Sequence, residues 1–249
     1  MLIHKNTAPS FLEKRFIKYE NNNILSATAV VTLFPYSCNY INDTLNINSA
    51  HYLGNVLNST RVPDISSINY KEKNRKILFI GRENYLEGAI KLLLSFDRIA
   101  KHDRSITLDI IGLDKRHFSS IPPRVNFHGY LNKSIEAESD LYYSLIENAS
   151  LIVNPTPRWS SFSSILEAMF FYTPVISTKT EEMVSTFSDE LSFGYYYESD
   201  KKLDFQILDI LNNDDYRKLA LNAHKSVSNF TWANFTKRLL LLMQEDSPS

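Results

Sequence analysis

Short apolar runs alternate with stretches of helical periodicity over most of the chain. The runs are nearly continuous, as in parallel strands that are buried on both faces. They cover Ala29–Leu33, Lys76–Ile80, Thr107–Ile111, Leu151–Asn154 and Pro174–Ser177. Apolar residues three or four positions apart predict helices over Tyr85–Ala100, Ile135–Asn148, Ser163–Phe171 and Phe205–Val227. This alternation predicts an α/β fold with a doubly wound, Rossmann-like parallel sheet.

The two ends of the chain fit the alternation less well. Residues 1–50 predict a helix, the strand Ala29–Leu33 and a second helix, which are too few elements to form a sheet of their own. We therefore expect a short leading segment over 1–50, one main domain over 51–230, and a carboxy-terminal helix with a frayed tail over 231–249. The apolar run Leu239–Met243 is expected to form one packed face of that last helix.

Composition and charge exclude several classes of protein. Lys+Arg 27 against Asp+Glu 28 gives a net charge of -1, so no basic surface indicates nucleic-acid binding. No apolar run approaches the ~20 residues that cross a bilayer, so membrane contact is expected to be peripheral at most. Cys38 is the only cysteine and no secretory signal begins the chain, which favours a cytoplasmic protein. The six histidines include no i,i+4 pair, so no metal site is expected.

Polar residues follow two of the apolar runs at the points where ligands bind in open α/β sheets. Gly81 and Arg82 end the run Lys76–Ile80, and a predicted helix begins a few residues later. Such a strand-to-helix turn suits an anion. Ser160, Ser161 and Glu167 follow Leu151–Asn154 in the same way. Because the carboxyl ends of parallel strands meet at one edge of a sheet, these residues predict a small-molecule site.

Several motifs in a fixed order resemble one family. They are ILFIGR at 77–82 with Gly88 after it, FHGY at 127–130, LIVNPT at 151–156, ILEAM at 165–169, TPVIST at 173–178 and FTW at 230–232. Over roughly residues 26–244 the chain resembles the carboxy-terminal, donor-binding half of the retaining group 1 nucleotide-sugar glycosyltransferases of the GT-B fold. The resemblance implies that residues 1–50 are a remnant of the first of two Rossmann-like domains.

The resemblance assigns a diphosphate-binding role to Arg82, beside Gly81. A guanidinium suits that role because it gives two charge-assisted hydrogen bonds to phosphate oxygens. The lysine that assists it in the family is replaced by Glu87. A carboxylate ~4 Å from a phosphate charge costs on the order of 4 kcal/mol at an effective dielectric of 20. Either Glu87 turns to solvent and Lys91 or Arg158 supplies the second cation, or the site no longer binds a diphosphate.

The resemblance also implies that Glu167 holds the hydroxyls of the nucleotide ribose, since a carboxylate accepts two hydrogen bonds at once. A second family glutamate is missing; Trp159 lies eight positions before Glu167. Ser160 and Ser161 offer hydroxyls and backbone amides to the donor instead. Simpler interpretations stay open: Arg82 pairs with Glu83 or Glu87 at the surface, the serines cap a helix, and Glu167 is a solvated helix residue.

The function that the resemblance implies is a glycosyltransferase, or its donor-binding part. It would transfer a sugar from a UDP- or GDP-sugar to a hydroxyl of a glycan or lipid-linked acceptor in surface glycan synthesis. Arg82 would stabilise the departing diphosphate without a metal or other cofactor. Because most of the first domain is missing, a partner chain is expected to supply it. The alternative is a non-catalytic, truncated module that binds a nucleotide or another protein.

Overall fold

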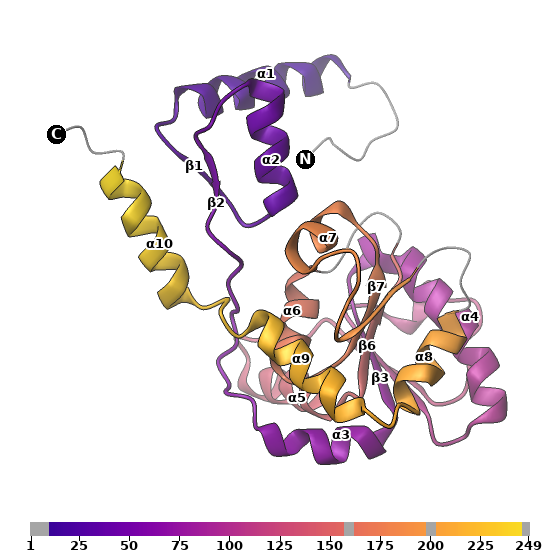
Figure 1. Ribbon diagram of the computed structural model, residues 1–249. Coiled ribbons are helices and arrows are strands. Elements are labelled where there is room, and N and C mark those ends of the chain that lie inside the picture. Colours follow the sequence, from indigo (N-terminus) through magenta and orange to yellow (C-terminus); the bar gives the residue numbers. More distant parts are fainter. Residues whose placement is uncertain (1–9, 157–161, 198–202, 246–249) are drawn as a thin grey trace. The chain divides into compact units, whose positions relative to one another are not determined.

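The computed structural model describes residues 10–156, 162–197 and 203–245 (Figure 1). The chain divides into two compact units, one made of Met1–Val56 with Phe230–Ser249 and the other of Leu57–Asn229. Within the described ranges, no helix combines the length and the apolar character needed to cross a membrane.

The second unit is built on a six-stranded sheet in which every neighbouring pair is parallel. The strand order is β5-β4-β3-β6-β7-β8. The strands are β3 (Lys76–Ile80), β4 (Thr107–Ile111), β5 (Val125–Gly129), β6 (Leu151–Asn154), β7 (Val175–Thr178) and β8 (Gly194–Tyr197). The chain runs outward from β3 to β5 and then crosses back to β6 on the other side of β3. The topological switch point therefore lies between β3 and β6.

Helices cover both faces of this sheet, which confirms the doubly wound fold. They are α3 (Ile68–Asn74), α4 (Leu86–His102), α5 (Glu136–Asn148), α6 (Phe162–Phe170), α7 (Glu181–Phe187), α8 (Leu203–Leu211) and α9 (Tyr216–Val227). Figure 1 shows α4 and α8 on one side of the sheet and α5 and α9 on the other.

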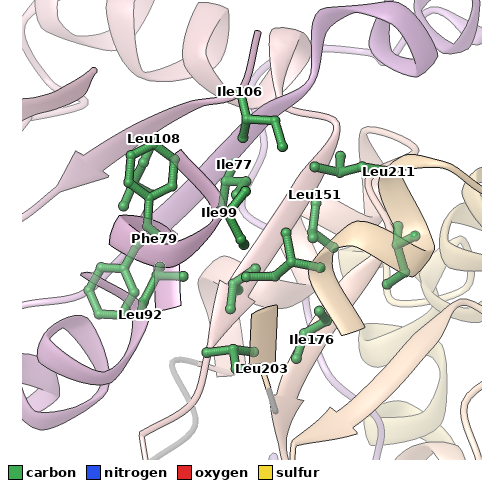
Figure 2. Close-up of a cluster of buried hydrophobic side chains, with 14 of the residues drawn as sticks. Ile77, Phe79, Leu92, Ile99, Ile106, Leu108, Leu151, Ile176, Leu203 and Leu211 are labelled. Carbon is green, nitrogen blue, oxygen red and sulfur yellow. The ribbon is translucent and has the colours of Figure 1, made fainter. Parts of the chain in front are cut away.

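The core beneath α4 and α8 is formed by residues on one face of the strands and one face of the helices. Alternate strand residues such as Ile77 and Phe79 point into it, and they meet α4 residues such as Leu92 and Ile99 (Figure 2). All four side chains are at most 2% exposed. Burying each such side chain is worth roughly 1.5–3 kcal/mol. This packing holds the carboxyl ends of the strands in fixed positions.

Two differences from the predicted elements have local causes. The helix predicted over Phe205–Val227 is two helices, because the run Asn212–Asp215 consists of residues that favour turns and caps over helix interiors. The strand β8 was not predicted. It begins at Gly194, where an added Cβ would lie 1.8 Å from the Val175 carbonyl oxygen. Only glycine allows β8 to approach β7 this closely.

The first unit corrects one prediction for the start of the chain. It contains α1 (Phe11–Ser26), β1 (Val30–Thr32), α2 (Pro35–Leu45), β2 (Ala50–Tyr52) and, from the carboxy-terminal end, α10 (Trp232–Glu245). β1 and β2 form a two-stranded parallel sheet, so this segment does make a small sheet of its own. The Asn42 amide holds β2 through two hydrogen bonds with the backbone of Ala50.

The apolar run at the end of α10 also differs from expectation. Leu242 is buried, whereas Leu240, Leu241 and Met243 are each at least half exposed. The run forms part of a helix, as predicted, but it is not a packed apolar face.

Candidate functional site

The candidate site lies at the carboxyl ends of β3 and β6, at the switch point of the sheet. Gly81 and Arg82 follow β3 directly, and one helical turn (η2, Glu83–Tyr85) leads from them into α4. An added Cβ on Gly88 would lie 2.2 Å from the Thr156 hydroxyl oxygen and 2.9 Å from the Thr156 amide nitrogen. The amino end of α4 therefore lies against the loop that follows β6. Helix amino ends carry partial positive charge, so this arrangement favours an anion between the two strands.

Arg82 makes its contact with an aromatic ring. Its guanidinium carbon lies 4.6 Å from the centroid of the Tyr130 ring, which belongs to the loop after β5. Both residues line an open hollow of about 660 Å³ at the ends of β3, β4 and β5, together with Gly112 and Asp114. A cation over an aromatic face is held in place while its N–H groups stay available to an anion.

The two glutamates that follow Arg82 have other partners. Glu87 is 64% exposed and pairs with Lys91 at 3.2 Å. Glu83 lies 3.5 Å from the His117 ring. Neither carboxylate is paired with Arg82 in the part of the chain that the structure describes, so the interpretation of Arg82 as one half of a surface pair finds no support. Glu87 turns to solvent, as the diphosphate hypothesis requires.

Glu167 on α6 is buried, so the interpretation as a solvated helix residue is wrong. Glu167 is only 5% exposed. The Lys133 ammonium donates to both carboxylate oxygens, each at 3.0 Å, and the Tyr142 hydroxyl donates to Oε2 at 2.7 Å. Burial, and secondly the charge of Glu167, raise the pKa of the Tyr142 hydroxyl far above its ordinary value. Tyr142 therefore keeps its proton and acts as a fixed donor.

One loop links the two candidate residues. Tyr130, against Arg82, and Lys133, against Glu167, are three positions apart in the connection from β5 to α5. This connection carries the chain back from the edge of the sheet toward β6. The Lys133 ammonium also lies 4.8 Å from the centroid of the Tyr142 ring. Arg82 and Glu167 thus each contact a residue of the same short connection.

Sequence reasoning missed Tyr130, Lys133 and Tyr142 as members of this site. Tyr130 belongs to the FHGY motif, which offered a signal. Lys133 is a lone lysine between Asn132 and Ser134 and shows no pattern. Of the predicted binding residues, Arg158, Ser160 and Ser161 lie outside the described residues, as does Trp159. Within the described ranges, no group of three His, Cys, Asp or Glu side chains is placed to hold a metal ion.

Comparison with known proteins identifies relatives of the second unit. Residues 74–213 match the model of the family described as "Glycosyl transferases group 1". A complex of a variant of TarM from S. aureus with Fondaparinux, alpha-GlcNAc-glycerol and UDP superposes with a TM-score of 0.73 at 18% identity, covering 96% of this chain and 48% of that one. Sucrose-phosphate synthase of Thermosynechococcus elongatus superposes with a TM-score of 0.70 at 18% identity, covering 96% and 64%.

A third structure, the GtfA/B complex, has a TM-score of 0.70 at 12% identity and covers 93% of this chain and 48% of that chain. These likenesses establish the fold. The chain spans about half the length of the TarM chain. No curated protein sequence matches it.

Proposed function

Because the chain belongs to the group 1 glycosyl transferases, we propose that its second unit binds the diphosphate and ribose of a UDP- or GDP-sugar, as the donor-binding part of a sugar-transferring enzyme. The observation that carries this proposal is that the connection from β5 to α5 contacts Arg82 through Tyr130 and Glu167 through Lys133. A guanidinium that suits a phosphate and a carboxylate that suits a diol therefore contact the same short connection, which supports the proposal.

The chemistry of transfer needs charge stabilisation more than a reactive side chain. The bond between the sugar and the diphosphate oxygen breaks, the oxygen of the acceptor hydroxyl bonds to the sugar carbon, and the diphosphate leaves with the bonding electrons. The proton of the acceptor hydroxyl passes to the departing diphosphate. Arg82 stabilises that leaving group through charge-assisted hydrogen bonds, and the amino end of α4 adds partial positive charge. Gly81, Lys91, Arg158, Ser160 and Ser161 are further candidates for contacts with the donor. No metal or other cofactor is required by this scheme.

Two further proposals concern the acceptor and a partner chain. We propose that the acceptor is a hydroxyl of a glycan or of a lipid-linked glycan, and that a partner chain contributes to its binding. The GtfA/B complex supports the idea that such proteins work in assemblies. TarM was crystallised with a GlcNAc-glycerol, which favours surface glycan synthesis. We place the protein in the cytoplasm, with at most peripheral membrane contact.

Two features favour a second candidate function. Glu87 occupies the position of a family lysine, and Lys133 already neutralises Glu167. A chain that has lost turnover but keeps a nucleotide-binding or protein-binding role would tolerate both features. The two candidates differ in whether the protein, with its partner, releases nucleotide from a nucleotide sugar.

Isothermal titration calorimetry with UDP and GDP tests the donor site. We expect one of the two nucleotides to bind with millimolar or better affinity, and Arg82→Ala to weaken that binding about tenfold or more, since a charged hydrogen bond is worth roughly 1.5–3 kcal/mol. Arg217→Ala, which removes an exposed arginine on α9, serves as the control and should bind like wild type. Absence of heat with both nucleotides would overturn the donor-site proposal.

A further inference from the structure

A diphosphate carries several negative charges, whereas Arg82 supplies one positive charge. The family lysine that would add the second is absent, and Lys91 is already paired with Glu87 at 3.2 Å. Lys133, three positions after the Tyr130 that contacts Arg82, is another cation of the candidate site. Its side chain is 38% exposed, so an anion can reach it.

The acceptor capacity of Glu167 shows why Lys133 has to move. A carboxylate has about four acceptor sites on its two oxygens. Lys133 uses one on each oxygen and Tyr142 uses another on Oε2. Among the described contacts about one site remains, whereas two ribose hydroxyls need two. One present donor must therefore leave when the ribose binds.

Lys133 is the donor that can leave. Tyr142 is 6% exposed and fixed in the core. Lys133 has a flexible four-carbon stem and a partly exposed ammonium group. The ring of Tyr142 stays beneath that ammonium at 4.8 Å, and Tyr143 lies at 5.7 Å, so the cation keeps a favourable surface as it shifts.

We propose that Lys133 is the second cation of the donor site, and that it passes from Glu167 to the diphosphate when a nucleotide binds. Glu167 is then released to accept the ribose hydroxyls. The loop geometry supports this, because Tyr130, three positions before Lys133, already lies against the diphosphate-binding Arg82. This inference rests on the proposed function. Its consequence is selectivity: a nucleoside without phosphates gives Lys133 no anion to move to, so it cannot free Glu167.

The test uses the background of Glu167→Gln, because Lys133→Met alone would leave a buried carboxylate without a counter-charge and endanger folding. Binding of UDP and of uridine is measured by NMR titration, which reaches millimolar affinities, for E167Q and for the double variant E167Q/K133M. We expect the double variant to bind UDP about tenfold or more weakly than E167Q, while uridine binds both equally. GDP and guanosine replace this pair if GDP is the tighter ligand.

Two further variants complete the test. Lys133→Arg in the wild-type background keeps the charge and should bind UDP within a few-fold of wild type. Lys101→Met, which removes an exposed lysine at the far end of α4, should change nothing. Equal UDP affinity of E167Q and E167Q/K133M would overturn the role of Lys133, and so would an equal loss for uridine and UDP. A wild-type protein that binds neither UDP nor GDP would instead overturn the proposed function itself.

Discussion

Replacing Lys71 by methionine should remove a pH dependence of stability that the structure builds into the second unit. Lys71 on α3 is fully buried. Its side-chain nitrogen donates to the Ile146 carbonyl at 2.9 Å and to the Thr173 hydroxyl at 2.7 Å. Burial lowers the pKa of Lys71 from 10.5 to about 7, against a smaller opposing effect of the Glu147 charge. The folded protein therefore holds this lysine largely uncharged above neutral pH.

The sign of the effect follows from proton linkage. Between pH 7 and 10.5 the unfolded chain keeps the Lys71 proton and the folded chain releases it, so the free energy of unfolding rises with pH. The limiting slope is about 1.4 kcal/mol per pH unit, which gives about 2 kcal/mol between neutral pH and about pH 9. Lys71→Met has no such proton, so this increase should vanish.

Urea unfolding at a series of pH values, followed by circular dichroism, measures the effect. The Ile146 carbonyl still accepts from the Ala149 amide at 3.2 Å, so the methionine variant leaves that carbonyl paired. Lys73→Met, an exposed lysine of the same helix, is the matched control and should keep the wild-type pH dependence. If Lys71→Met and wild type show the same change in stability from neutral pH to about pH 9, the lysine is not buried uncharged and the reasoning fails.

Three other changes test the site and its scaffold. Glu167→Ala should destabilise the protein by roughly 1–3 kcal/mol in urea unfolding, because the buried Tyr142 hydroxyl loses its acceptor; an unchanged midpoint would contradict the buried cluster. Gly88→Ala should cost about 1–3 kcal/mol, since its Cβ would lie 2.2 Å from the Thr156 hydroxyl oxygen, and wild-type stability would show that α4 does not approach this loop. Arg82→Lys keeps the charge but loses the two-pronged guanidinium, so calorimetry should show weaker nucleotide binding; full affinity would exclude a bidentate contact.

The apolar runs predicted most of the sheet because parallel strands are buried on both faces and are therefore apolar throughout. β3, with Ile77, Leu78 and Phe79 all at most 1% exposed, is an example. The three-residue strand β2 could not be predicted in this way, since it exists through its pairing with β1. Its residues Ala50, His51 and Tyr52 show no strand pattern of their own.

Only those residues of the candidate site that belong to motifs could be predicted from the sequence. Arg82 and Glu167 follow strands at the positions where α/β folds bind ligands, and the resemblance to a family named them. Whether they bind the donor stays a prediction. Lys133 could not be found, because its contact with Glu167 depends on how the β5–α5 connection returns across the sheet. That path is set by the strand order, which local sequence does not contain.

The central claim is that Arg82 and Glu167 hold the two ends of one nucleotide diphosphate. A crystal structure of the protein with UDP, or with GDP if that nucleotide binds more tightly, tests it directly. We predict the diphosphate at the Arg82 guanidinium and the ribose hydroxyls at the Glu167 carboxylate, with the Lys133 ammonium moved from the carboxylate to a phosphate oxygen. A nucleotide whose diphosphate does not contact Arg82 and whose ribose does not contact Glu167, with the pair of Lys133 and Glu167 intact, would contradict the account.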